Sequence, residues 1–129
     1  MSQTIQARVI VGGKAEGEAL VSIAAISFLG GVDAESGVII EKGHPLEGQS
    51  IAGRILVFPG GKGSTVGSYV IYRLAKANLA PKAIINSNSE PIVAVGALIA
   101  GIPMVDHIDI RRIETNMHIS IDEGVVCID

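Results

Sequence analysis

The sequence predicts a single α/β domain over residues 1–129, with two β layers, one helical layer (β/β/α) and a mixed sheet whose second half contains parallel crossovers. Three observations carry this prediction. The length of 129 residues suits one compact core. Hydrophobic residues make up 48% of the chain but aromatic residues only 3%, so the core must be built from aliphatic side chains. The second half alternates apolar runs of strand and helix type.

The first half is predicted to be mainly strands. Short β-branched or aliphatic runs, separated by glycine-containing turns, occupy residues 7–11, 19–23, 26–29 and 38–40. No strong helical period interrupts them, and the pattern changes only at Arg54.

The second half predicts right-handed βαβ crossovers. Residues 55–58 form a continuous apolar run, typical of a strand that is buried on both faces. After it, Val66, Tyr69, Val70 and Leu74 recur at helical spacing, with Ser64 or Thr65 placed to cap the helix N-terminus. Further runs predict a strand at 83–85, a polar loop at 86–90, a helix at 92–100 that Pro91 begins, a strand at 104–105, and a hairpin of 117–121 and 125–128.

Charge and cysteine content exclude several classes of function. The net charge is −3, and no cluster of lysine or arginine is interleaved with aromatic residues, which argues against binding to nucleic acid or to an anionic membrane. The longest apolar stretch, 92–103, contains two glycines and is shorter than a membrane span. Cys127 is the only cysteine, so this chain is expected to bind no metal or iron–sulfur cluster by itself. The N-terminus shows no secretory signal, and we expect a cytoplasmic protein.

The glycine-rich stretch GGKGST at residues 60–65 is the candidate functional loop. It lies where a buried strand passes into a helix, so main-chain amides and the positive end of the helix dipole are expected to converge there. Gly61 and Gly63 let the backbone approach an anion closely, Lys62 adds a positive charge, and the hydroxyls of Ser64 and Thr65 lie in the same field. The spacing matches neither the phosphate loop of nucleotide hydrolases nor the dinucleotide fingerprint. We therefore predict a site for a small anionic substrate.

A packing interpretation of the same residues stays open: the glycines could only form a tight turn, and Ser64 could only cap a helix. Other polar residues are better explained by structure than by function. Asp106, His107 and Asp109 alternate with isoleucines, as on the solvated face of a strand, and Glu16 and Glu18 alternate in the same way.

Several segments together resemble the small subunit of the aconitase X family. They are FPGGKGSTVGSY at 58–69, AEGEAL at 15–20, ISFLGGVD at 26–33, HPL at 44–46, PKAIIN at 81–86 and PIVAVGA at 91–97. The resemblance covers nearly the whole chain and implies a single swivelling domain that works with a separate large subunit. It implies a hydro-lyase that removes water from (R)-5-phosphomevalonate to give trans-anhydromevalonate 5-phosphate in isoprenoid synthesis by the archaeal mevalonate pathway. Related members dehydrate cis-3-hydroxy-L-proline, and that substrate stays an alternative.

The resemblance also implies roles for residues. Ser64 would be the base that removes a proton from the carbon next to the substrate carboxylate, while Gly61, Lys62, Gly63 and Thr65 would contact substrate. A [4Fe–4S] cluster in the large subunit would take the leaving hydroxyl. Aconitases proper place an arginine two residues after this serine, where the present chain has Val66. The clamp on the substrate carboxylate is therefore expected from the partner.

Two other classes of function are weighed against the dehydratase. A stand-alone module could use the glycine loop to bind an anion without catalysis. A mobile phosphohistidine domain would have a similar layered shape, but it needs a histidine in its glycine-rich loop, where this chain has Ser64 followed by Thr65. The phosphohistidine alternative therefore ranks last.

Overall fold

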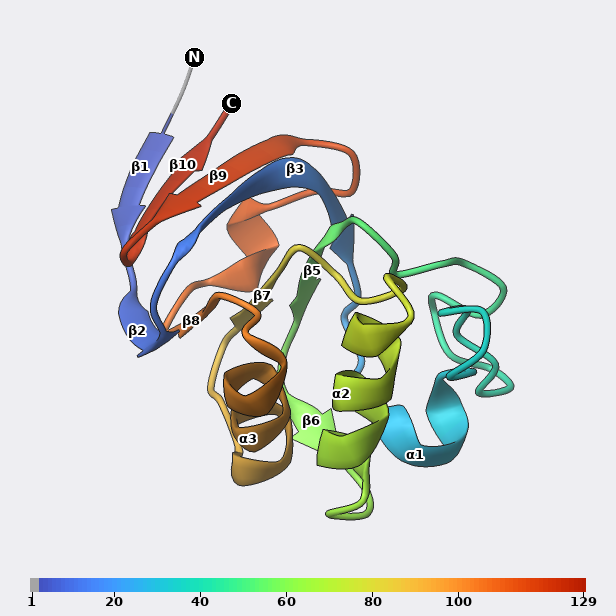
Figure 1. Cartoon of the computed structure of the whole chain (residues 1–129). Coiled ribbons are helices and arrows are strands. Elements are labelled where there is room, and N and C mark those ends of the chain that lie inside the picture. Colours follow the sequence, from blue (N-terminus) through green and yellow to red (C-terminus); the bar gives the residue numbers. More distant parts are fainter. Residues whose placement is uncertain (1–2) are drawn as a thin grey trace.

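An eight-stranded mixed sheet with helices on one side forms the framework of the molecule in the computed structural model, which describes residues 3–129 (Figure 1). The strands in this sheet are β1 (Gln3–Gln6), β2 (Arg8–Val11), β3 (Lys14–Val21), β5 (Ile55–Phe58), β7 (Ala83–Asn86), β8 (Met104–Asp106), β9 (His118–Asp122) and β10 (Val125–Ile128). A separate small ladder joins β4 (Ile26–Ser27) to β6 (Gly61–Lys62). The helical elements are α1 (Phe28–Gly31), α2 (Gly67–Lys76), α3 (Pro91–Ala100) and the 3₁₀ turn η1 (Ile110–Arg112).

The strand order β1-β10-β9-β3-β5-β7-β8-β2 combines parallel and antiparallel pairing. The strands β3, β5, β7 and β8 run parallel to one another, with Leu56 opposite both Leu20 and Ile84. The remaining pairs are antiparallel, including the terminal hairpin of β9 and β10. The predicted α/β class, with a mixed sheet and parallel crossovers in the second half, is confirmed.

The two outermost strands of the sheet are consecutive parts of one segment. Only Ala7 separates β1, which pairs with β10, from β2, which pairs with β8. The amide of Ala7 donates to the carbonyl oxygen of Gly124 at 2.9 Å and holds this junction against the terminal hairpin. The sheet therefore curls into a barrel-like body whose seam is a single stretch of chain, as the adjacent β1 and β2 in Figure 1 show.

The alternation of side chains along the strands supplies two cores. In β5, Leu56 and Phe58 face the helices, where they pack with Ile71, Leu74 and other apolar residues. Ile55 and Val57 face the interior of the curled sheet, among residues of β9 and β10. All four side chains of β5 are fully buried, which confirms the prediction of a strand covered on both faces.

The helices α2 and α3 pack closely against each other over the outer face of the sheet (Figure 1). Gly96 of α3 makes this approach close, because a Cβ built there would lie 2.6 Å from the Cδ1 of Ile71 and 3.2 Å from the Cα of Ser68. In α3, Pro91 occupies the first turn and Gly101 closes the C-terminus in the left-handed conformation, with φ of 72°. Within residues 3–129, no helix is both long and apolar enough to cross a bilayer.

The structure differs from the predicted elements mainly in the first half. The predicted strand at 26–29 is only two residues long and continues as the short, kinked α1. Residues 38–40 make isolated bridges rather than a strand, whereas β3 begins five residues earlier than predicted, at Lys14. Glu16 and Glu18 are exposed on β3, as expected. Periodicity does not reveal these boundaries, because tertiary pairing and not local propensity fixes the ends of such short strands.

Candidate functional site

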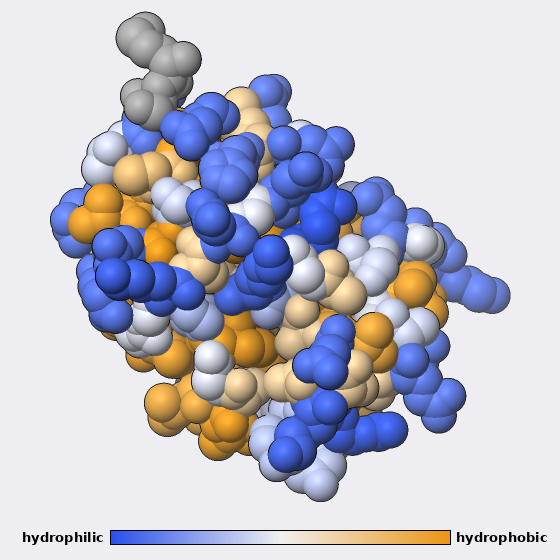
Figure 2. Space-filling model, turned by 45° about the horizontal axis from the view of Figure 1, so that its top comes forward, coloured by the Kyte–Doolittle hydropathy of each residue, from blue (hydrophilic) through white to orange (hydrophobic). Residues whose placement is uncertain are grey.

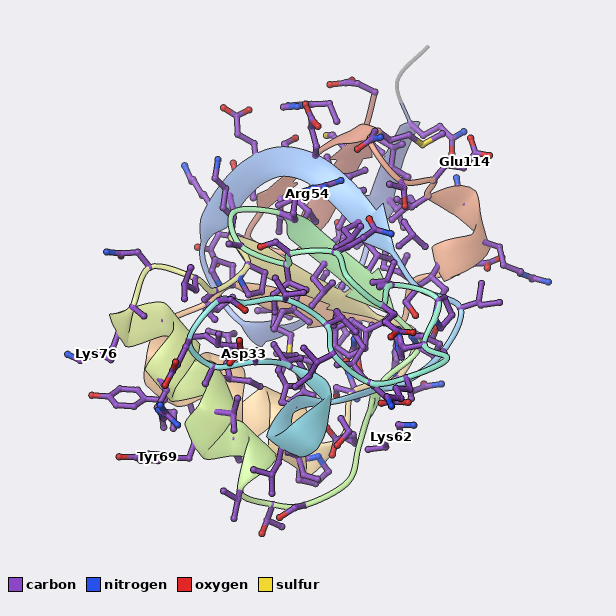
Figure 3. All side chains as sticks on the ribbon, turned by 90° about the vertical axis from the view of Figure 1, so that its right-hand side faces the viewer. Asp33, Arg54, Lys62, Tyr69, Lys76 and Glu114 are labelled. Carbon is purple, nitrogen blue, oxygen red and sulfur yellow. The ribbon has the colours of Figure 1, made fainter. Side chains whose placement is uncertain are left out.

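The candidate loop projects from the carboxyl edge of the parallel strands. It leaves the buried β5, passes through β6 and reaches the first turn of α2, and residues 62–66 are all exposed. Ligands bind at this edge in open α/β sheets, because loops of neighbouring parallel strands meet there. In Figure 3, Lys62 and Tyr69 lie toward the lower end of the molecule, and Arg54 and Glu114 lie at the opposite end.

Ser64 presents its hydroxyl at the turn that leads into α2. Its Oγ accepts a hydrogen bond from the amide of Val66 at 3.2 Å, and its carbonyl oxygen accepts from the amide of Gly67 at 2.9 Å. The predicted helix cap is wrong in detail, because the N-cap residue is Val66 and no side chain of the described residues caps α2. The first amides of α2, those of residues 67–69, donate instead to the main-chain carbonyl oxygens of residues 64–66 at 2.9–3.2 Å. The positive end of the α2 dipole lies next to the Ser64 hydroxyl.

The N-terminus of α3, in contrast, already holds a carboxylate from the chain itself. Glu90 accepts from the amides of Ile92 and Val93 at 2.9 and 2.8 Å. Gly61 lies against this cap: a Cβ there would collide with Glu90 Oε1 and come within 2.5 Å of Val93 Cγ2. The packing of Gly61 on Glu90 accounts for a glycine at this position. Unlike α3, α2 has no carboxylate cap among the described residues.

Lys62 is held by a carboxylate rather than pointing freely into the loop. Its Nζ lies 3.3 Å from Oε2 of Glu41, and both side chains are partly exposed. Glu41 is fixed in turn, because its amide donates to the carbonyl oxygen of Gly31 at 3.3 Å. An exposed pair of this kind is worth about 0–1 kcal/mol, so a substrate anion could compete for Lys62 at small cost.

Gly63 adopts a backbone conformation that favours glycine, with φ of 92°. A Cβ at this position would also collide with the hydroxyl oxygen of Ser27. At the other end of the loop, a Cβ on Gly67 would lie 3.5 Å from the Cβ of Phe28. The segment formed by β4 and the start of α1 therefore contacts the loop on both sides of Ser64.

Thr65 opens onto a shallow groove of about 280 Å³ between the first turns of α2 and α3. Its other lining residues are Ser68, Pro91, Ile92 and Val95. The groove is mainly apolar, which suits a hydrocarbon portion of a ligand or an apolar side chain better than an anion. The structure thus brings the predicted residues together on one loop, with Ser64 and Thr65 facing solvent and Gly61 turned toward Glu90.

The prediction that Asp106 lies on a solvated face of a strand is wrong. Its side chain is completely buried and accepts two hydrogen bonds from Arg8, at 2.8 and 2.7 Å, and one from the amide of Ser89 at 2.8 Å. The Arg8 guanidinium lowers the pKa of Asp106 from 3.8 to about 2, against the opposing effect of burial. The partner lies 98 residues away in sequence, so no local pattern could reveal it.

His44, the other buried ionisable residue of note, has a structural role. Its Nε2 lies 3.0 Å from the carbonyl oxygen of Ala25, and its Nδ1 accepts from the amide of Leu46 at 3.0 Å. These two bonds fix the neutral tautomer that donates from Nε2. They tie the 41–50 loop to the segment that precedes β4.

The donor set for an iron–sulfur cluster is not present in the described part of this chain. Residues 3–129 contain no group of three or more His, Cys, Asp or Glu residues placed to hold a metal ion. Cys127 is half-buried on β10, with its Sγ 3.8 Å from Thr4 Oγ1. A single thiolate does not fit a cluster that needs three or four ligands.

Comparison with known proteins gives a consistent match along the chain. Residues 4–128 match the model of the aconitase X swivel domain. The phosphomevalonate dehydratase small subunit of Thermococcus kodakarensis is 58% identical over 118 residues, which cover 92% of this chain and 89% of that protein. The protein of the same name from Methanocella arvoryzae is 63% identical over 106 residues, or 82% and 80% of the two chains.

Solved structures agree with the sequence comparison. The crystal structure of Thermococcus kodakaraensis aconitase X in its holo-form superposes with a TM-score of 0.96 at 56% identity, and the match covers 98% of both chains. A structure determined by solution NMR superposes with a TM-score of 0.86 at 51% identity, with 96% and 97% of the two chains covered. The fold of this chain is therefore the fold of these two solved structures.

Proposed function

This chain belongs to the aconitase X swivel-domain family, and we propose that it is the small subunit of a dehydratase that removes water from mevalonate 5-phosphate. The observation that carries the proposal is the identity of more than half of the residues to proteins named as this subunit, together with an exposed Ser64 on the loop that the family resemblance marks. The product is then an anhydromevalonate 5-phosphate.

Ser64 is proposed as the base that takes a proton from the carbon beside the substrate carboxylate. To act as a base its hydroxyl must first pass its own proton to solvent or to a basic group of the large subunit. The amide of Val66 already points at the Oγ that would become negative. The positive end of the α2 dipole favours the same charge. Lys62 stabilises it further if the bond to Glu41 opens.

The magnitudes indicate that this chain cannot activate Ser64 alone. Ionising a hydroxyl as weakly acidic as water at neutral pH costs on the order of 10 kcal/mol. A helix N-terminus contributes about 0.3–1 kcal/mol, a hydrogen bond to a charged group about 1.5–3 kcal/mol, and an exposed lysine about 0–1 kcal/mol. The remainder must come from a partner that encloses the loop and excludes water.

We assign this task to a separate large subunit, which would also hold the iron–sulfur cluster that accepts the departing hydroxide. The described residues of this chain offer no cluster ligands, and the loop is exposed rather than enclosed. Large apolar side chains remain exposed on the segments around the loop: Ile23, Leu29, Ile40 and Val66. Exposed apolar surface beside a functional loop is typical of a protein interface.

The test is an anaerobic assay of the chain reconstituted with its large subunit. Mevalonate 5-phosphate should lose water, while cis-3-hydroxy-L-proline serves as the rival substrate. Ser64→Ala should lower kcat at least a thousandfold without weakening assembly, because the proton acceptor is removed while the loop backbone stays.

Ser50→Ala is a matched control for Ser64→Ala. The Ser50 hydroxyl accepts from the amide two residues later, that of Ala52, at 3.2 Å on an exposed turn, which is the geometry of Ser64. This control should keep full activity. Turnover by Ser64→Ala near that of the unmutated complex would remove the serine from the reaction, and binding of phosphate without any large subunit would favour a non-catalytic module.

A further inference from the structure

The position of Ser64 depends on a segment that precedes it by more than thirty residues. The two-residue strand β4 pairs in parallel with β6, so that Ser27 lies opposite Lys62. The amide of Ile26 also donates to the carbonyl oxygen of Gly60 at 3.2 Å. These bonds fix the backbone that enters the serine loop, which comprises residues 60–66 around Ser64.

The side chain of Ser27 extends this hold to the residue next to Ser64. Its hydroxyl occupies the space where a Cβ on Gly63 would project, and the left-handed φ of 92° at Gly63 turns the chain around it. The same hydroxyl donates to the carbonyl oxygen of Leu29 at 3.0 Å, which keeps it from rotating away. The Ser27 side chain is thus packed between α1 and the serine loop.

The far end of the loop is supported by the same segment. Phe28 follows Ser27 directly, is almost fully buried, and packs beside Gly67 at the start of α2. The contacts of Ser27 with Gly63 and of Phe28 with Gly67 bracket the three residues Ser64–Val66. Two of the contacts that hold the exposed loop therefore come from adjacent residues.

We propose that Ser27 is a positioning residue for the reaction, whose hydroxyl holds Gly63 and thereby sets the direction of the Ser64 Oγ. This inference rests on the proposed function of Ser64. Its physical basis is that a displacement of about 1 Å in a reacting group can cost on the order of a hundredfold in rate. Ser27 itself does not touch the reacting atoms.

The experiment uses the complex with the large subunit and measures assembly, kcat and KM separately. Ser27→Ala keeps the Cβ but removes the oxygen that abuts Gly63. We expect kcat to fall about tenfold or more, with KM and the dissociation constant of the two subunits each within about twofold of the unmutated values. Ser27→Thr retains the hydroxyl and should restore kcat to within about threefold.

Ser36→Ala is the matched control, because Ser36 donates a comparable bond, to Asp33 Oδ2 at 2.8 Å, away from the serine loop. It should leave kcat unchanged. The inference is overturned if Ser27→Ala turns over within threefold of the unmutated complex, if its loss of rate equals a loss of assembled complex, or if Ser27→Thr is no more active than Ser27→Ala.

Ser64→Ala, measured in parallel, separates this inference from the proposed function. An inactive Ser64→Ala with a fully active Ser27→Ala overturns only the role of Ser27. An active Ser64→Ala overturns the proposed function and the positioning role with it.

Discussion

The bond between Asp106 and Arg8 shows how a single buried carboxylate joins distant parts of the chain. Asp106 ends β8, Arg8 begins β2, and the amide of Ser89 donates to the same carboxylate. Because the two carboxylate oxygens of Asp106 join three segments, removing them would free the loop after β7 as well as the edge strand β2. Several hydrogen-bond donors around a buried carboxylate favour its charged form over its protonated form.

This carboxylate predicts a loss of stability in acid. The pKa of Asp106 in the folded chain is about 2, below its ordinary 3.8, so its contribution is complete above about pH 4 and is lost as the pH falls toward 2. The difference in pKa corresponds to about 2 kcal/mol.

The measurement is the free energy of unfolding from denaturant titrations at pH 6, 4 and 2. Asp106→Asn should reduce the decline between pH 6 and pH 2 by about 2 kcal/mol relative to the unmutated chain. Arg8→Met removes the donor that lowers the pKa and should reduce the decline at least as much. A decline in both variants equal to that of the unmutated chain would contradict this account.

At the same scale, the sequence predicts which residues form the serine loop but not how each one is held. The spacing of glycines around Lys62 and Ser64 is visible in the sequence, and the structure places these residues on one exposed loop. The partners of the loop, Ser27 and Glu41, come from segments far away in the chain, and their contacts require the β4–β6 ladder. The substrate roles of Gly61, Lys62, Gly63 and Thr65 stay predictions.

Among the elements, the helices and the central strands follow from local patterns while the first half does not. The continuous apolar run of β5, and Pro91 and Gly101 at the ends of α3, are signals that act within the element itself. The short β4 and α1 are held by contacts with β6 and α2, so their boundaries have no local signal. The local apolar pattern predicts a strand over 26–29, and pairing with β6 limits β4 to its first two residues.

The contact between α2 and α3 predicts a steric cost at Gly96. A Cβ there already lies 3.0 Å from the Cβ of Ile71, so the two branches of valine would force the helices apart. Gly96→Val should lower the free energy of unfolding by about 2 kcal/mol, because overpacking outweighs the small gain in helix propensity.

Thermal and denaturant unfolding measure this effect, with Gly12→Val as the control. A Cβ on Gly12 meets the carboxylate end of Glu123, a flexible side chain that can move aside. The control should lose less than half as much stability as Gly96→Val. Equal stability of Gly96→Val and the unmutated chain would show that the helices are not in close contact at this point.

At the scale of the whole molecule, exposed apolar side chains are unevenly distributed. Figure 2 shows hydrophilic residues over much of the upper part of one face and hydrophobic residues gathered at its lower left. The large apolar residues exposed by 44% or more are Val9, Ile23, Leu29, Ile40, Val66, Tyr69, Val95, Leu98 and Ile99. None of these belongs to β1, β9 or β10, and only Val9 lies against the terminal hairpin, at Gly124.

This distribution predicts that the large subunit covers the side with the serine loop. Ile23 is 85% exposed and lies three residues before β4, the strand that holds the loop. Ile23→Asp should weaken binding of the large subunit at least tenfold, because a charge would be buried at the interface.

Binding of the two subunits by calorimetry or light scattering checks this prediction. Thr4→Asp places the same charge on the exposed β1, at the other end of the molecule, and should bind normally. An Ile23→Asp chain that binds as tightly as Thr4→Asp would place the interface elsewhere.

The seam at Ala7 also determines when this molecule can close during synthesis on the ribosome. Residues 3–11 are made before their partners, which are β10 at one side and β8 at the other, and β10 ends at Ile128. Contacts between such distant parts of the sequence form slowly, because a long loop must be ordered before they are gained. The nascent β2 therefore has no partner until β8 has been made, and β1 has none until β10 has been made.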